Sequence, residues 1–523
     1  MRVLIFHGYL LRGTGSNIYT VNLCRAMVAL GHEVHLLCQE RDVGQLGLVD
    51  AVGRWDSGSL QVEVLREPVR VTVYNPDIGR TLPVYVADDY EGFDAVPFKD
   101  LSAAALDGYL EANVSAVSDV VERVAPDVAL ANHLVMGPVI LARGLGGKVP
   151  YAVKVHGSAL EYTVRPQPER FLPYALEGLA AAGGVLVGSG HTAESRWEVT
   201  GERDLPARTR LGPPGVDVEA FRPQGLEETS AALAALADRL EEGDAAGWGG
   251  EPGAADALRA LDPERDRIVG FLGKLIVSKG VDLLLAAWPL VVAEVPEARL
   301  CVVGFGTYRQ ALTAMLDALA AADLAALRDL AARGREPEGG PPGELSHQIA
   351  FIDGLSGARR ERYLHAAPLA AARVHFTGRL EHEDLPSVLP SWDAMVVPST
   401  FPEAFGMVAA EAAASGALPL SAAHSGLAEV TAILAEALDE PLRPLLSFGR
   451  GPGAVEEIAR KLVAWLQLGH DERARAAASL AQMARRRFGW ESVAQGVIAA
   501  ALGRLEELPD PVAGAAPSGG TSG

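Results

Sequence analysis

Short apolar runs and amphipathic stretches alternate along this chain. The apolar run at 3–6 is followed by a glycine-containing loop at 13–17, by apolar positions at helical spacing over 21–30, and by a second apolar run at 34–38. A short continuous apolar run is typical of a parallel strand that is covered on both faces. The first forty residues therefore predict a strand–helix–strand unit with a right-handed crossover.

The same alternation continues in two arrays. The first array predicts strands at 128–130, 151–155 and 184–187 and helices at 136–143 and 171–182. Short alternating runs at 60–100 predict a β-rich insertion. The second array predicts strands at 268–272, 299–303, 374–376, 394–397 and 418–420, helices at 281–294 and through Glu411, and a long Ala-rich helical insertion at 307–370.

Turn residues and a change in composition divide the two arrays. Pro213, Pro214 and Gly215 form a turn cluster, and residues 243–253 are rich in glycine, which is typical of a linker. The chain is predicted to be α/β, with two Rossmann-like doubly wound domains that face a central cleft. The predicted parts are an N-terminal domain at 1–222, a linker or insertion at 223–264, a C-terminal domain at 265–484, a helix at 485–506 that crosses back to the first domain, and a disordered tail at 507–523.

Charge and cysteine content exclude several classes of partner. The 523-residue chain has 46 Lys and Arg against 67 Asp and Glu, a formal net charge of −21, which repels nucleic acids and anionic membranes. We therefore expect no nucleic-acid partner, and membrane contact that is at most peripheral. Arg485–Arg487 are interpreted as a solvated helix end. Cys24, Cys38 and Cys301 have apolar neighbours and no metal-ligand spacing, which is typical of reduced core residues in a cytoplasmic protein. No apolar run reaches the ~18–20 residues that span a bilayer.

The segment 398–412 contains the most informative motif. Seven residues separate Glu403, in the loop after a predicted strand, from Glu411, in the following helix. Gly406 opens this helix, so its free N–H groups and its positive dipole end point at the strand-end cleft. A loop carboxylate can accept hydrogen bonds from sugar hydroxyls, and a carboxylate farther along the helix can bind a ribose diol.

This segment resembles the E-x7-E signature of the retaining GT-B glycosyltransferases of family 4, and the continuation at 414–419 and 425–430 matches as well. The resemblance implies transfer of a hexosyl group from a nucleoside diphosphate sugar to an acceptor hydroxyl, with retention at the anomeric carbon. It implies an acceptor-binding N-terminal domain and a donor-binding C-terminal domain. The donor is a UDP-, GDP- or ADP-sugar, and the acceptor is a sugar, a lipid-linked molecule or a small molecule. The donor-binding residues implied are Gly15, Gly273, Lys274, Lys279, Glu403, Ala404, Phe405, Gly406, Met407, Val408 and Glu411.

The segment 273–280 resembles the family pattern Gly-Arg-Leu followed by Lys-Gly, whose cations hold the donor diphosphate. Lys274 stands where the family has Arg, so a bidentate fork becomes a point charge. A departing nucleoside diphosphate accumulates negative charge, which Lys274, Lys279 and helix dipoles stabilise without a metal. We therefore expect no metal and no cofactor. Phe305 is a second departure, since the family commonly has Asp there.

The N-terminal half supplies the remaining candidates by the same resemblance. The loop at 13–17 resembles the family's glycine loop, and Gly13, Thr14 and Asn17 are expected to face the acceptor, as is Glu161. His156 follows the predicted strand 151–155 and looks like the family's histidine that contacts the transferred sugar. The expected catalytic residues are His156, Lys274, Lys279 and Glu403.

Two alternative functions stay open from the sequence. One is another GT-B enzyme, such as a sugar-nucleotide epimerase or a phosphorylase. The other is a non-catalytic protein that binds a nucleotide sugar. Motifs for other chemistries are missing: there is no P-loop, no hydrolase nucleophile elbow and no HExxH sequence, and His347, His365, His375 and His382 lack metal-ligand spacing.

Overall fold

The computed structural model divides the chain into two compact units. Unit 1 comprises Met1–Gly215 and Gly489–Gly523, and unit 2 comprises Val216–Phe488. The structure describes residues 1–11, 15–41, 43, 47–85, 92–242, 251–338, 343–403 and 405–511. The predicted site residues Gly13, Thr14 and Ala404 lie outside these ranges, as does most of the predicted tail. Within them, no helix is both long and apolar enough to cross a membrane.

Unit 1 is built on a nine-stranded sheet with the strand order β11-β10-β9-β8-β1-β2-β5-β3-β4. All of its pairings are parallel except β3 with β4. Its strands are β1 (Arg2–Phe6), β2 (Glu33–Leu37), β3 (Ala51–Asp56), β4 (Ser59–Val64), β5 (Val71–Asn75), β8 (Val128–Asn132), β9 (Tyr151–Lys154), β10 (Gly184–Val187) and β11 (Thr209–Leu211). The strands at the centre, β1 and β8, are buried almost throughout, as continuous apolar runs predict.

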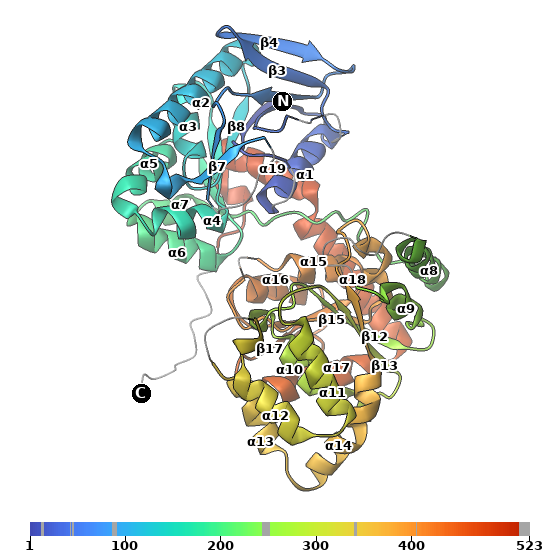
Figure 1. The fold of residues 1–523 in the computed structure, drawn as a ribbon. Coiled ribbons are helices and arrows are strands. Elements are labelled where there is room, and N and C mark those ends of the chain that lie inside the picture. Colours follow the sequence, from blue (N-terminus) through green and yellow to red (C-terminus); the bar gives the residue numbers. More distant parts are fainter. Residues whose placement is uncertain are drawn as a thin grey trace. The chain divides into compact units, whose positions relative to one another are not determined.

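Helices cover both faces of this sheet. They are α1 (Gly15–Ala29), α2 (Ala103–Val124), α3 (Gly137–Leu145), α4 (Gly157–Ala159), α5 (Pro168–Ala180), α6 (Gly190–Thr200), α7 (Leu205–Arg208) and α19 (Trp490–Ala501). The chain moves one way along the sheet from β1 to β2 and the other way from β8 to β9, so right-handed crossovers place α1 and α3 on opposite faces. The C-terminal helix α19 packs beside α1 (Figure 1). The direction of winding reverses between β1 and β8, which makes the ends of these strands the expected ligand edge of unit 1.

The first part of the region 60–100, β4 and β5, belongs to the main sheet and not to a separate insertion. β5 pairs in parallel with β2 on one side and with β3 on the other. Only β6 (Thr81–Val84) and β7 (Asp94–Pro97) form a small sheet of their own. The sequence pattern missed this because β4 is mostly exposed and reads as an isolated polar hairpin strand.

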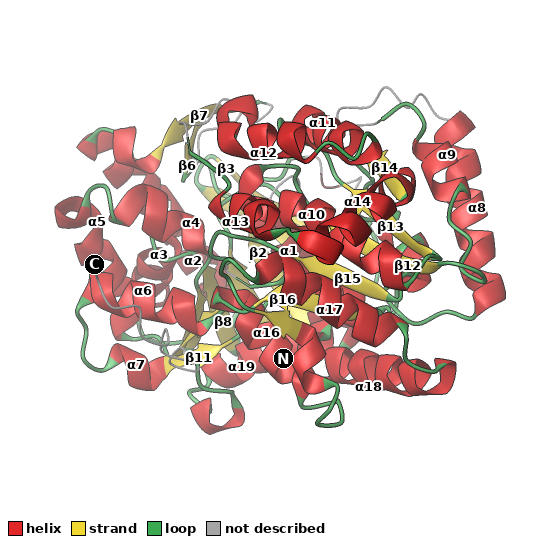
Figure 2. Ribbon diagram, turned by 90° about the horizontal axis from the view of Figure 1, so that it is seen from below, coloured by secondary structure: helices red, strands yellow, loops and turns green. Residues whose placement is uncertain are grey.

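Unit 2 is built on a six-stranded parallel sheet with the order β14-β13-β12-β15-β16-β17. Its strands are β12 (Arg267–Leu272), β13 (Ala298–Val303), β14 (Val374–Gly378), β15 (Ala394–Val397), β16 (Leu418–Ala422) and β17 (Ser447–Phe448). Winding reverses between β12 and β15, so α10 (Val281–Glu294) and α15 (Met407–Ala414) lie on opposite faces; Figure 2 shows helices on both sides of these strands. The ends of β12 and β15 are thus the ligand edge of unit 2.

The predicted helical insertion at 307–370 is part of the core of unit 2. It forms α11 (Arg309–Ala320), α12 (Leu324–Arg333), α13 (Ser346–Gly354) and α14 (Gly357–Ala372). Helix α14 packs along α10, and the Tyr363 hydroxyl donates to the Ala286 carbonyl at 3.0 Å. The many alanines allow this close helix packing, which their weak hydrophobicity concealed in the sequence.

The segments that join the two arrays also differ from the predicted boundaries. The predicted linker at 223–264 carries α8 (Leu226–Glu242) and α9 (Ala254–Arg259), whose buried leucines join the core of unit 2. The single predicted C-terminal helix is two helices, α18 (His470–Phe488) and α19, because the backbone at Gly489 is extended. Gly215 packs against the start of α19, since a Cβ added to Gly215 would lie 2.4 Å from the Trp490 ring. Two further helices of unit 2 are α16 (Ser425–Ala435), which follows β16, and α17 (Ala454–Leu466), which follows β17.

Candidate functional site

Two short loops form the ligand edge of unit 2. The first follows β12 and runs through Gly273 and Lys274 to a 3-10 turn at Val277–Lys279. The second follows β15 and runs from Pro398 to Glu403. The Thr400 amide donates to the Ser278 carbonyl at 2.9 Å, so the two loops are bonded to each other.

Glycine is required where these loops meet. The backbone of Gly280 has a φ of +70°, and an added Cβ would lie 2.0 Å from the Pro398 carbonyl oxygen. By contrast, nothing lies within 4 Å of a Cβ added to Gly15, at the start of α1. Gly280 therefore serves the backbone, whereas the structure itself gives no reason for glycine at position 15.

The two predicted lysines have different surroundings. Lys274 is exposed and has no acidic partner among the described residues. Lys279 is 32% exposed and its Nζ forms an ion pair with Glu403 Oε1, which also accepts a hydrogen bond from Ser399 Oγ at 2.7 Å. Lys279 is thus held in place by a carboxylate, whereas Lys274 has no such partner in the ranges that the structure describes.

The loop after β15 leads directly into helix α15. The Glu403 amide donates to Ser425 Oγ at 2.8 Å, which fixes the loop to the start of α16. Gly406 is the N-cap of α15, and the amides of Met407 and Val408 have no acceptor among the described residues. Phe405 is buried against Phe488, with ring centroids 5.6 Å apart. Phe405 therefore anchors the loop in the core of unit 2, while the backbone amides of Met407 and Val408 are available to bind an anion.

Glu411 lies one turn into α15 and is 4% exposed. Its Oε1 lies 2.9 Å from His382 Nε2, and this contact raises the pKa of His382, with burial acting against it. The His382 ring packs edge-on against Phe221 at 5.3 Å between centroids. His382 was considered above only as a metal ligand, and it was not predicted as a partner of Glu411, because no rule of motif spacing reveals a contact between residues 29 positions apart.

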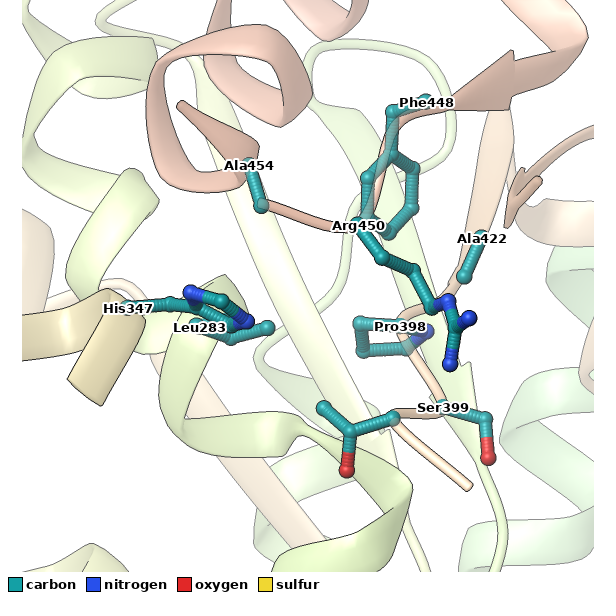
Figure 3. Close-up of a pocket in the computed structure, with 9 residues that line it drawn as sticks. Leu283, His347, Pro398, Ser399, Ala422, Phe448, Arg450 and Ala454 are labelled. Atoms are coloured by element: carbon teal, nitrogen blue, oxygen red, sulfur yellow. The ribbon is translucent and has the colours of Figure 1, made fainter. Parts of the chain in front are cut away.

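A pocket of about 170 Å³ opens beside the β15 loop. Its lining residues are Leu283, His347, Pro398, Ser399, Thr400, Ala422, Phe448, Arg450 and Ala454. In Figure 3 the Arg450 side chain extends from the end of β17 toward Pro398 and Ser399. None of the predicted donor residues lines this pocket, although Ser399 also bonds Glu403.

The ligand edge of unit 1 holds three histidines. His7 follows β1, His133 follows β8 and His156 follows β9. The ring centroids of His7 and His133 lie 6.1 Å apart, and those of His133 and His156 lie 4.9 Å apart. Burial lowers the pKa of His7 to about 4, and it lowers the pKa of His133 and of His156 well below the usual value. All three imidazoles are therefore neutral at pH 7.

His133 was not predicted and is the least satisfied of the three. It is 2% exposed, and neither ring nitrogen has a hydrogen-bond partner among the described residues. Its backbone has a φ of +69°, a left-handed conformation that is uncommon outside glycine and that clusters at functional sites. The Tyr19 hydroxyl nearby is also buried without a partner within the described part of the chain.

The other predicted residues of unit 1 fall in two environments. Asn17 is fully buried, and its Oδ1 accepts a hydrogen bond from His7 Nε2 at 2.9 Å. Glu161 is exposed and forms an ion pair with Arg165 at 3.1 Å. Asn17 thus belongs to the histidine cluster, whereas the Glu161 carboxylate is engaged on the surface. In the ranges that the structure describes, no group of three or more acidic, histidine or cysteine side chains is placed to hold a metal ion.

Comparison with known families gives two matches. Residues 14–215 match the model described as a glycosyl transferase 4-like domain, and residues 348–434 match the model described as glycosyl transferases group 1. The second match covers both Glu403 and Glu411, and begins inside the helical region of α13.

The curated relatives are named glycosyltransferases as well. The chain is 26% identical over 499 residues to a D-inositol 3-phosphate glycosyltransferase from Frankia alni, covering 92% of this chain and 93% of that protein. It is 31% identical over 258 residues to a protein of the same name from Salinispora tropica, covering 47% of this chain and 39% of that protein.

Solved structures with the same fold span almost the whole chain. Anabaena Alr3699/HepE in complex with UDP aligns with a TM-score of 0.52 and 16% identity, covering 97% of this chain and 100% of that chain. A glycosyltransferase from Rickettsia africae aligns with a TM-score of 0.53 and 12% identity, covering 95% and 97%. At these identities the likeness establishes the fold alone: an α/β fold of the GT-B type, with a parallel sheet in each unit.

Proposed function

This chain belongs to the glycosyl transferases of group 1 and is a glycosyltransferase with the GT-B fold, and we propose the reaction that it catalyses. The reaction is transfer of a hexosyl group from a nucleoside diphosphate hexose to an acceptor hydroxyl, with retention at the anomeric carbon. Unit 2 binds the donor, and unit 1 supplies the acceptor side and His156.

One observation carries the donor half of this proposal. Lys274 is exposed, Lys279 is fixed by Glu403, and the first amides of α15 have no acceptor within the described part of the chain. All of these groups follow the adjacent strands β12 and β15. These groups are positive or hydrogen-bond donors, so this edge suits a diphosphate. Charge that develops on a departing nucleoside diphosphate is stabilised there by groups that are in place before the bond breaks.

The two glutamates take the parts of the donor that bear hydroxyl groups. Glu403 is oriented by Lys279 and Ser399, which leaves its carboxylate able to accept hydrogen bonds from the transferred sugar. Glu411, oriented by His382, binds the ribose diol. Charged acceptors make hydrogen bonds roughly twice as strong as neutral ones, which suits carboxylates to these contacts.

The acceptor belongs to unit 1 in this proposal. The names of the relatives make a phosphorylated inositol the first acceptor to test, followed by free sugars and lipid-linked sugars. His156, with its neutral ring at the end of β9, meets the transferred sugar.

Retention is tested by following donor cleavage by 1H NMR, with water or an acceptor as the nucleophile. With an α-linked donor, we expect the α anomer to appear first, before mutarotation mixes the anomers. A β anomer as the first product would overturn retention and would require a base opposite the leaving group.

A further inference from the structure

A line of hydrogen bonds runs through unit 1 from the Leu10 carbonyl to His156. We infer that His7 and Asn132 are positioning residues, which hold His156 as its Nε2–H tautomer and so present the Nδ1 lone pair to a hydroxyl group of the substrate. The inference rests on the proposed function in one respect, namely that His156 meets the substrate. Every residue of the line belongs to unit 1.

The line begins at a group whose role is fixed. His7 Nε2 lies 3.1 Å from the Leu10 carbonyl oxygen and 2.9 Å from Asn17 Oδ1. A carbonyl oxygen only accepts, so Nε2 must carry the ring hydrogen. Because burial keeps His7 neutral, with a pKa of about 4, its Nδ1 has a lone pair and must accept.

The orientation of the Asn132 amide follows. Asn132 Nδ2 lies 3.2 Å from His7 Nδ1 and 3.1 Å from Thr20 Oγ1. The Thr20 hydroxyl gives its own hydrogen to the Ser16 carbonyl at 2.8 Å, so it accepts from Asn132. Both amide hydrogens are thereby used, and a flipped amide would place an oxygen against the His7 lone pair. Asn132 Oδ1 therefore faces the other way.

The tautomer of His156 follows from the orientation of the Asn132 amide. Asn132 Oδ1 only accepts, and it lies 3.1 Å from His156 Nε2, so Nε2 carries the hydrogen. Burial lowers the pKa of His156 well below its usual value, so the ring is neutral and Nδ1 has no hydrogen. Within the described part of the chain, the hydrogen bond of the His156 ring is made through Nε2 and none is made through Nδ1. The ring is held between Tyr19, edge-on at 5.3 Å, and His133 at 4.9 Å.

The tautomer of His156 determines which chemical group of the substrate its Nδ1 atom can contact. A lone pair on Nδ1 accepts a hydrogen bond from a hydroxyl and repels the oxygens of a phosphate or carboxylate. His156 therefore recognises a sugar hydroxyl and does not contact the diphosphate. A similar lone pair could not arise if Asn132 were reversed, because Nδ2 would then donate to Nε2.

The test is the tautomer of His156 in the free protein, observed by two-bond 1H–15N NMR on the full chain labelled at histidine and assigned by comparison with His156→Gln. We expect the wild type to show only the Nε2–H form. In Asn132→Leu we expect a mixture of both tautomers and a fall in donor-cleavage kcat/KM of about 10- to 100-fold, in line with the loss of one buried hydrogen bond. Circular dichroism and thermal melting establish that the variant folds.

The matched control is Tyr151→Phe, which removes a buried hydrogen bond of unit 1 to the Gly178 carbonyl and leaves every group of the line from His7 to His156 in place. We expect it to keep the single tautomer and a kcat/KM within about threefold of the wild type. An Nδ1–H form in the wild type overturns the inference, as does a single Nε2–H form in Asn132→Leu. Because the NMR measurement uses the free protein, it decides the inference even if no donor is cleaved, which would count against the proposed function instead.

Discussion

Replacing Lys279 with methionine is expected to lower kcat/KM for sugar transfer about 100- to 1,000-fold, the loss typical of removing one fixed group that stabilises developing charge. Lys279 is positioned by Glu403, which is itself held by Ser399, so its ammonium group is in place before the diphosphate departs. Methionine keeps the length and much of the volume of the side chain. Initial rates over a range of donor concentrations give the effect.

A double variant separates two roles that Lys279 could have. In Lys279→Met, the Glu403 carboxylate loses its counter-charge, and this alone could reduce activity. In Lys279→Met with Glu403→Gln, the charge balance is restored but the cation facing the diphosphate is still missing, so we expect the double variant to be far less active than Glu403→Gln alone and no more active than Lys279→Met. Recovery to near the wild-type rate would mean that Lys279 only neutralises Glu403.

The second large effect is acid destabilisation of unit 1. The pKa of His7 is lowered from 6.5 to about 4 in the folded state by burial, and the pKa values of His133 and His156 are lowered as well. Between these folded values and 6.5 the unfolded chain binds more protons, so the free energy of unfolding rises with pH in this window. The stability is fully present above about pH 6.5 and is lost as the pH falls toward 4. For His7 alone the loss amounts to about 3 kcal/mol at 1.36 kcal/mol per pKa unit.

Hydrogen exchange measured from pH 7 to pH 4.5 and corrected for intrinsic rates resolves the two units. We expect protection in β1, β8 and β9 to fall with decreasing pH more steeply than in β12 and β15. His133→Phe removes a buried titrating ring whose nitrogens have no described partner, and phenylalanine suits the neighbouring Tyr9 and Tyr85 rings. This variant should therefore show a shallower pH dependence. An equal slope in the variant and the wild type would contradict a titrating role for the cluster.

Much of the fold could be predicted because buried parallel strands are continuous apolar runs. The strands that form the two ligand edges, β1, β8, β12 and β15, were each predicted within two residues of their observed ends. The pattern failed where burial depends on distant partners. β17 has only two residues, and α14 is rich in alanine but packs along α10.

The residues of the candidate site were predicted where a local motif contains them, but their contacts with distant residues were not. Lys279 and Glu403 were predicted separately from local motifs, and the structure brings them into an ion pair. His382 follows β14 and contacts Glu411 in α15, and the line from His7 through Asn132 to His156 joins the ends of three different strands, β1, β8 and β9. Such contacts are set by strand order, which neither hydrophobic periodicity nor motif spacing specifies. The predicted roles of Gly13, Thr14 and Ala404 stay predictions, since these residues lie outside the described ranges.

Unit 2 binds nucleoside diphosphates in the proposed reaction, and isothermal titration of UDP, GDP and ADP in the presence of EDTA measures that binding. We predict that one of the three binds the wild type without a metal, that Lys274→Ala weakens it about tenfold or more, and that Glu411→Gln weakens it as well. Lys148→Ala, an exposed lysine of unit 1 outside the site, should bind as the wild type does. No binding by any nucleotide in EDTA, or binding that Lys274→Ala leaves unchanged, would contradict the metal-free diphosphate site.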